Sequence, residues 1–143
     1  MPPASSRLEG EFQTMSAVPK PRQQLRMMIV DDSNVMRRRI ERSQQNDLLE
    51  VVGTAVNGLD AVTKFKQLMP DVMTLDLTMP EMDGIECVEH VIKIKPDVLI
   101  LVVSALADKA TAVEAIEKGA NGFLCKPFTD DQLNEALAEL IGE

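Results

Sequence analysis

The sequence contains no tryptophan or tyrosine, only two cysteines, and no long run of apolar residues. Cys87 and Cys125 are too few for a disulfide framework and lack the spacing of metal ligands, so we expect two reduced thiols, as in cytosolic proteins. No apolar run approaches the roughly 18 residues that a membrane span needs, and the N-terminus lacks a hydrophobic signal-peptide segment. These absences predict a cytoplasmic protein with no membrane association.

Basic residues are also scarce. The 143 residues include 15 Lys or Arg and 23 Asp or Glu, which gives a net charge of −8. A protein that binds nucleic acid along its phosphates needs a basic face, so the charge balance argues against direct nucleic-acid binding. With four phenylalanines as the only aromatics, the core must consist of Val, Ile, Leu, Met and Ala. The length fits one domain of ordinary size.

Residues 1–26 differ in composition from the rest of the chain. They hold four of the eight prolines and show no periodic apolar pattern, which indicates a flexible arm. The stretch LEGEF, followed by an internal Met15, is also compatible with a cloning remnant. We therefore assign 1–26 to an arm and 27–143 to a single folded domain.

From Met27 onward, short apolar runs alternate with helical patterns. The predicted strands are 27–30, 50–55, 71–76, 97–104 and 121–126, and several are apolar at consecutive positions. Such runs are typical of a parallel sheet covered by helices on both faces. Strict alternation of strands and helices predicts right-handed crossovers and a doubly wound α/β fold. In that architecture, ligands bind beyond the carboxyl ends of the strands.

Local signals mark the ends of the helices between these strands. Pro96 stops the helix that follows residue 84, and Gly119 is placed to cap the next one. Thr129 and Gln132 have the spacing of a capping box at the start of the last helix.

Polar residues fall where the predicted strands end. Asp31 and Asp32 follow the first strand, Asp76 ends the third, Ser104 ends the fourth and Lys126 ends the fifth. Carboxyl ends of parallel strands share one edge of a sheet, so these side chains should converge. Three packed carboxylates repel and raise one another's pKa values. A hard divalent cation relieves that repulsion, and oxygen-only ligands suit Mg²⁺.

Each of these residues has a simpler explanation when taken alone. Asp31, Asp32 or Ser33 could cap a helix, Asp76 could belong to a turn before Pro80, and Lys126 could be a solvated surface lysine. The arginines at 37, 38, 39 and 42 predict a solvated basic face, with a kinase-docking surface as the alternative. The conjunction of polar residues at successive strand ends favours a functional site.

Four segments resemble the receiver domains of two-component response regulators: DDSNVMRRRI, LDLTMPEMDGIE, the strand ending VVSA, and GANGFLCKPF. The resemblance covers nearly everything outside the arm, and MRRRI makes single-domain chemotaxis regulators the most similar group. It implies a flavodoxin-like (βα)5 receiver fold with strand order 2-1-3-4-5.

The resemblance also implies roles for individual residues. Asp76 matches the phosphoacceptor, a carboxylate that attacks phosphohistidine and becomes an acyl phosphate. Asp31 and Asp32 match the acidic pair that, with Asp76 and the backbone carbonyl of Thr78, binds Mg²⁺. Lys126 should pair with the phosphoryl group.

Further positions follow from the same match. The Lys126–Pro127 bond is expected to be cis, and Ser104 should hydrogen-bond a phosphoryl oxygen. Phe123 occupies the aromatic switch position, where a phenylalanine can act only by packing. Thr78 and Leu106 match the two positions that tune phosphoryl lifetime, and we expect Leu106 to slow hydrolysis.

The implied partners are a histidine kinase or histidine phosphotransfer protein and a downstream target, such as a flagellar motor component. The target would bind the face formed by the last two helices and the last strand, after a population shift. Two alternatives remain open: a receiver excised from a larger regulator, and an aspartyl-nucleophile phosphohydrolase. The second is disfavoured because Thr78 stands where such phosphatases carry a second Asp.

Overall fold

The structure is a computed structural model, and it describes residues 24–79, 81–105 and 109–143. Strands and helices alternate along these residues without exception. Their bounds are β1 (Leu25–Val30), α1 (Asn34–Ser43), β2 (Leu49–Ala55), α2 (Gly58–Leu68), β3 (Val72–Leu75), α3 (Gly84–Ile94), β4 (Leu99–Ala105), α4 (Lys109–Glu117), β5 (Gly122–Lys126) and α5 (Asp130–Leu140). The predicted alternation of strands and helices is confirmed.

The strands form one five-stranded sheet in the order β2-β1-β3-β4-β5, and every adjacent pair is parallel. The predicted strand order is therefore confirmed. The order reverses between β1 and β3, which are direct neighbours although β2 lies between them in sequence. This reversal defines the edge where a doubly wound fold binds its ligand.

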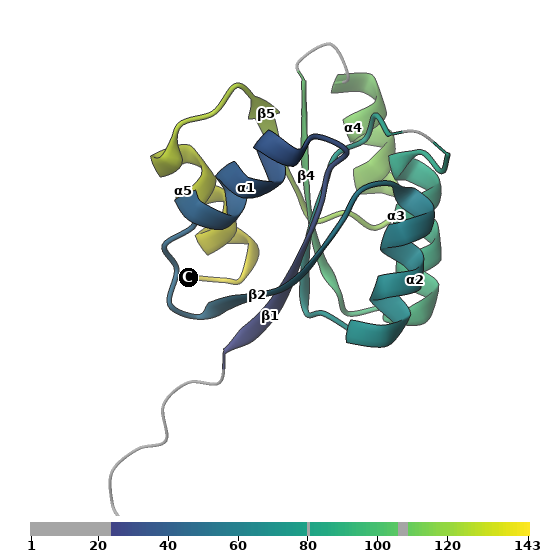
Figure 1. Cartoon of the computed structure of the whole chain (residues 1–143). Coiled ribbons are helices and arrows are strands. Elements are labelled where there is room, and N and C mark those ends of the chain that lie inside the picture. Colours follow the sequence, from purple (N-terminus) through teal and green to yellow (C-terminus); the bar gives the residue numbers. More distant parts are fainter. Residues whose placement is uncertain (1–23, 80, 106–108) are drawn as a thin grey trace, which may run out of the picture.

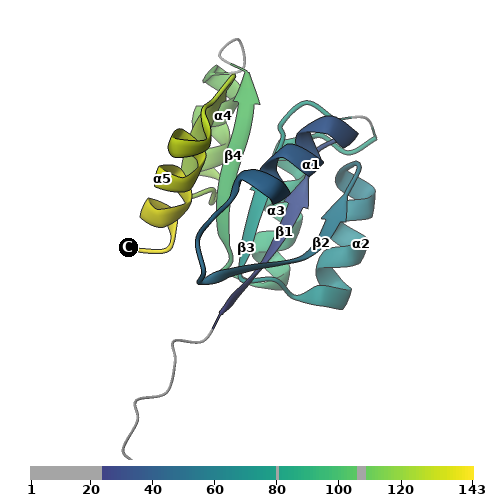
Figure 2. The same cartoon turned by 60° about the vertical axis from the view of Figure 1, so that its left-hand side comes forward.

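Helices cover both faces of the sheet (Figure 1). The α1 and α5 helices lie on one face, and α2, α3 and α4 lie on the other, an arrangement that the rotated view also shows (Figure 2). Side chains along a strand alternate between the two faces. In β1, Met28 and Val30 therefore join the cluster beneath α2–α4, whereas Met27 and Ile29 join the cluster beneath α1 and α5.

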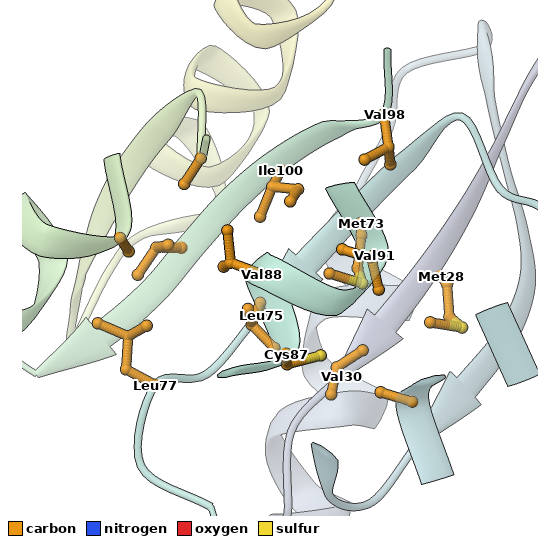
Figure 3. Packing of buried hydrophobic residues seen from close by; sticks show 14 of the residues in the cluster. Met28, Val30, Met73, Leu75, Leu77, Cys87, Val88, Val91, Val98 and Ile100 are labelled. Atoms are coloured by element: carbon orange, nitrogen blue, oxygen red, sulfur yellow. The ribbon is translucent and has the colours of Figure 1, made fainter. Parts of the chain in front are cut away.

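Aliphatic and sulfur-containing side chains dominate both cores. Figure 3 shows the cluster beneath α2–α4, where Met28, Met73 and Leu75 from the strands meet Cys87 and Val91 from α3. Burial raises the pKa of the Cys87 thiol to about 12. Both cysteines are free, as the sequence predicted.

Capping interactions fix the helix ends. Ser33, Asn57 and Asp83 each accept a hydrogen bond from the backbone N–H three residues later, at the start of α1, α2 and α3. The predicted capping box of α5 is present, because Thr129 and Gln132 bond reciprocally. Gly119 has a φ of 128° after α4, a conformation that favours glycine.

At its N-terminal end the sheet begins at Leu25, so Leu25 and Arg26 are strand residues. Residues 1–23 of the predicted arm lie outside the described residues, and the arm remains a prediction. Among the helices of the described part, none is long and apolar enough to cross a membrane.

Candidate functional site

Asp76 follows β3 directly, at the edge of the sheet where the strand order reverses. Its backbone N–H donates to the carbonyl oxygen of Val30 at 3.0 Å, which continues the β1–β3 pairing by one residue. The Asp76 side chain accepts a hydrogen bond from the Thr78 N–H at 3.3 Å. Asp76 is only 6% exposed, so its carboxylate lies in a largely enclosed position.

Asp31 follows β1 and is more deeply buried than Asp76. Its N–H donates to the Ala55 carbonyl at 3.1 Å, and its Oδ1 accepts from the Ser33 N–H at 2.8 Å. Asp32 is exposed. Because Ser33 caps α1, neither aspartate is needed as the cap, and both carboxylates remain available for the site.

Asp31, Asp32 and Asp76 each place a carboxylate oxygen within 4.8 Å of the other two. Oxygen atoms at such separations can share one cation, and a set of carboxylates alone suits a hard ion such as Mg²⁺. The donor set therefore fits the predicted metal. The combination of one exposed and two buried carboxylates opens the cluster to solvent on the Asp32 side.

Lys126, the last residue of β5, reaches the same cluster. Its Nζ lies 3.0 Å from Oδ2 of Asp31 and 3.8 Å from Oδ1 of Asp76. The Lys126–Pro127 peptide bond is cis, as the resemblance to receiver domains implied. Three carboxylates and one ammonium, contributed by three strands, therefore meet at one edge of the sheet, as the positions of the strand ends predicted.

The cluster alters the acidity of Asp76. Burial raises the pKa of this carboxyl to about 6, and the nearby charges of Asp31 and Asp32 act in the same direction. The Lys126 ammonium and the hydrogen bond from the Thr78 N–H oppose the rise. A cation bound among these carboxylates would favour the ionised form of Asp76, which is the nucleophilic form.

Of the other predicted site residues that the structure describes, Ser104 lies near the end of β4, Phe123 near the start of β5 and Thr78 just after Asp76. Ser104 is fully buried near the end of β4 and pairs in register with Cys125, one residue before Lys126. Phe123 is half-buried on β5 and packs against the cluster beneath α2–α4. Thr78 is exposed just beyond Asp76. Leu106 lies outside the described residues.

Two arginines that the sequence assigned to a solvated face are engaged instead. Arg37 donates to the backbone carbonyl of Asp31 at 2.7 Å, and Arg39 donates to the carbonyl of Phe128 at 2.5 Å. Arg38, between them, is exposed. Helical spacing offered one signal for Arg39, which lies three residues after Met36 and one before buried Ile40, on the inward side of α1. No sequence pattern distinguishes Arg37 from its neighbours.

Comparison with protein families identifies the response regulator receiver domain over residues 27–138. The chain is 44% identical over 112 residues to the chemotaxis protein CheY of Thermotoga maritima, covering 78% of this chain and 93% of that protein. It is 46% identical over 122 residues to a protein-glutamate methylesterase/protein-glutamine glutaminase of Halalkalibacterium halodurans, covering 83% of this chain but 35% of that longer protein.

Solved structures agree with these matches. A CheX–CheY–BeF3–Mg complex from Borrelia burgdorferi aligns with a TM-score of 0.78 and 27% identity, over 85% of this chain and 92% of that one. The response regulator domain of Thermotoga maritima CheB aligns with a TM-score of 0.74 and 33% identity, over 83% and 95% of the two chains.

Proposed function

Because the chain belongs to the family of response regulator receiver domains, we propose that it accepts a phosphoryl group on Asp76 and acts as a signalling switch. One observation carries the proposal. A carboxylate that is 6% exposed lies within 4.8 Å of two further carboxylates and 3.8 Å from a lysine ammonium. This arrangement can bring together an anionic nucleophile, a cation and an incoming phosphoryl group.

In the transfer step, a carboxylate oxygen of Asp76 attacks the phosphorus of a phosphohistidine on a partner protein. The new O–P bond forms as the N–P bond breaks, and the histidine leaves as a neutral imidazole after taking up a proton. The hydrogen bond from the Thr78 N–H at 3.3 Å holds one carboxylate oxygen, which orients the other toward the donor. Orientation of this kind lowers the entropic part of the barrier.

Charge balance is the main task of the surrounding residues. Asp31, Asp32, Asp76 and the Thr78 carbonyl would hold Mg²⁺, which offsets the negative charge of the transferred group. Lys126 would pair with a phosphoryl oxygen as a compact charge, and Ser104, at the end of the neighbouring strand β4, would donate a hydrogen bond to the phosphoryl group. Thr78 and Leu106 would tune the rate at which the acyl phosphate hydrolyses.

The output is a change in binding to other proteins. Recruitment of Ser104 by the phosphoryl group would draw in the end of β4, and Phe123 on β5 would repack as that strand end moves. We propose that this shifts the α4–β5–α5 face toward a form that binds a downstream target, such as a flagellar motor component. The donor would be a histidine kinase or phosphotransfer protein. The cytoplasmic location indicated by the sequence remains a prediction.

Mass spectrometry provides the decisive test. The protein is incubated with Mg²⁺ and acetyl phosphate, digested, and searched for a phosphoryl adduct on the peptide containing Asp76. We expect one adduct in the parent and none in Asp76→Asn. A parent that carries no adduct, or an adduct that persists in Asp76→Asn, would contradict the proposal. Parallel samples with EDTA test whether the metal is required.

A further inference from the structure

Arg39, on α1, contacts the loop between β5 and α5 just after Lys126. Its Cζ atom lies 4.4 Å from the centroid of the Phe128 ring, and its Nη2 donates to the Phe128 carbonyl at 2.5 Å. The same nitrogen lies 3.5 Å from Oδ1 of Asp130. One guanidinium therefore engages the ring, the backbone and a nearby carboxylate of a segment far away in the sequence.

We propose that Arg39 is a positioning residue for Lys126, an inference that rests on the proposed function. Phe128 is two residues after Lys126, so fixing the Phe128 carbonyl and ring restrains the backbone from which the lysine side chain extends. Lys126 itself has four rotatable side-chain bonds and a partly exposed side chain. The position of its ammonium therefore depends on how firmly the backbone of Lys126 is held. Small displacements of such a group carry large rate penalties.

The same helix also restrains the carboxylate half of the site. Arg37 donates to the backbone carbonyl of Asp31 at 2.7 Å, two positions before Arg39. The helix α1 is thus hydrogen-bonded to the segment carrying Asp31 and to the segment carrying Lys126. The Asp31 carboxylate and the Lys126 ammonium lie 3.0 Å apart. The segments that carry them are both hydrogen-bonded to α1, one through Arg37 and the other through Arg39.

The contacts of Arg39 differ in their expected contribution. A planar guanidinium can stack on an aromatic ring and donate in its own plane at once, which an ammonium cannot do. The pair with Asp130 is long, and the Asp130 side chain is 58% exposed. Exposed pairs of this kind contribute little. Positioning of the loop should therefore depend on Phe128 and the guanidinium plane, and hardly at all on Asp130.

A purely structural role is the competing explanation, since Phe128 is buried in the core between α1, α5 and the sheet. In that case, loss of Arg39 would lower the free energy of unfolding and leave the site of the folded molecules intact. Positioning instead predicts a defect in the folded protein, confined to the half of the site that Lys126 supplies. The two explanations differ in which measurements change.

The test compares Arg39→Met and Arg39→Lys with Arg38→Met, a matched control at the exposed neighbouring arginine, and with Asp130→Asn. Calorimetry measures Mg²⁺ affinity, which reports on the carboxylates, and beryllofluoride affinity in saturating Mg²⁺, which reports on the complete phosphoryl site. The rate of Asp76 labelling is followed against acetyl phosphate concentration. Hydrogen exchange of the amides at 126 and 128–129 is measured in metal-free protein, and urea unfolding is measured for every variant.

We expect both Arg39 variants to bind Mg²⁺ at least as tightly as the parent, because a displaced Lys126 ammonium competes less for Asp31. Both should bind beryllofluoride about tenfold more weakly, as for a misplaced charged contact. Their labelling rates should fall by a similar factor. Hydrogen exchange at the measured amides should be faster even without metal. Arg38→Met and Asp130→Asn should match the parent in all of these measurements.

Parental beryllofluoride affinity and labelling in folded Arg39→Lys would overturn the inference, even if the variant were less stable. Equal defects in Arg38→Met would also overturn it. If Arg39→Met does not fold, Arg39→Lys carries the test, because it keeps the charge and the aliphatic stem. A parent that is not labelled on Asp76 refutes the proposed function instead, so the two failures are distinguishable.

Discussion

The ammonium of Lys126 lies closer to the carboxylate of Asp31, at 3.0 Å, than to that of Asp76, at 3.8 Å. The Lys126 ammonium therefore neutralises part of the negative charge that would otherwise attract a divalent cation. Two opposite unit charges at such distances attract each other by roughly 4–6 kcal/mol at the effective dielectric of a protein surface, before the cost of desolvation. Binding of a metal by Asp31 must weaken this contact, which frees the lysine for a phosphoryl oxygen.

Lys126→Met is therefore expected to raise the affinity for Mg²⁺ several-fold while it lowers the rate of phosphorylation. The substitution removes a cation that competes for Asp31 but also the group that would receive the phosphoryl charge. Titration calorimetry at pH 7.5 measures the first effect, and labelling by acetyl phosphate measures the second. Weaker Mg²⁺ binding in the variant would show that the lysine supports the metal site and does not compete with the metal.

The acidity of Asp76 predicts a stability effect with a defined pH dependence. Its pKa of about 6 in the folded protein exceeds the unfolded value of about 3.9. The folded state therefore binds more protons between these values, and stability falls as pH rises from about 4 to 6. At pH 7, Asp76→Asn should be more stable than the parent by up to about 3 kcal/mol.

Urea unfolding in EDTA at pH 4 and at pH 7 tests this expectation. The gain from Asp76→Asn should be present at pH 7 and largely absent at pH 4, where the parent carboxyl is protonated. Excess Mg²⁺ at pH 7 should narrow the difference, because the metal binds the folded parent through Asp76 and stabilises it. An equal gain at both pH values would assign the effect to packing and exclude ionisation as its cause.

Gly84 lies against the backbone of the phosphoacceptor segment. A Cβ atom at this position would meet the Leu77 Cα at 2.6 Å and the Asp76 carbonyl oxygen at 3.1 Å. We expect Gly84→Ala to destabilise the fold by about 1–3 kcal/mol and to slow labelling of Asp76 in the folded fraction. Gly122→Ala is a milder comparison, because its Cβ would meet only side-chain atoms, the nearest at 3.3 Å.

Urea unfolding and acetyl phosphate labelling of both glycine variants separate these effects. Labelling is scored per folded molecule, so that lost stability is not counted as lost reactivity. Should Gly84→Ala match Gly122→Ala in both measurements, the backbone around Asp76 adapts without consequence, and the close approach has no functional role.

The sequence was sufficient to predict the sheet and the charged half of the site. Alternating apolar runs determine a parallel sheet, and the carboxyl ends of parallel strands share an edge. The convergence of Asp31, Asp76 and Lys126 follows from those two facts alone. Strand order came from resemblance to a family, because apolar alternation is compatible with more than one order.

Contacts made by side chains across layers could not be predicted in the same way. Arg39 and Phe128 are 89 positions apart, and their contact depends on how α1 and α5 pack on the sheet. The three consecutive arginines of α1 look alike in sequence, although helical geometry turns them in different directions. The preference of Lys126 for Asp31 likewise depends on ångström-scale placement that no sequence pattern carries.

Thr74 presents an unusual feature of the core below Asp76. Its side-chain oxygen is buried without a hydrogen-bond partner among the described residues, and the residue is 1% exposed in the middle of β3. Burial of an unsatisfied hydroxyl costs about 1–3 kcal/mol. Valine has nearly the same shape and β-strand preference, so Thr74→Val should stabilise the protein by about 1 kcal/mol or more.

Urea unfolding of Thr74→Val measures this gain, with Thr54→Val as the control on the partly exposed edge strand β2, where a change within about 0.5 kcal/mol is expected. Labelling of Asp76 should be retained in Thr74→Val, since the hydroxyl lies below the site and belongs to none of its contacts. A loss of stability in Thr74→Val would show that a buried water satisfies the hydroxyl in solution. The hydroxyl and its bound water would then stabilise the sheet beside Asp76, and the Thr74 hydroxyl would have a water molecule as its hydrogen-bond partner.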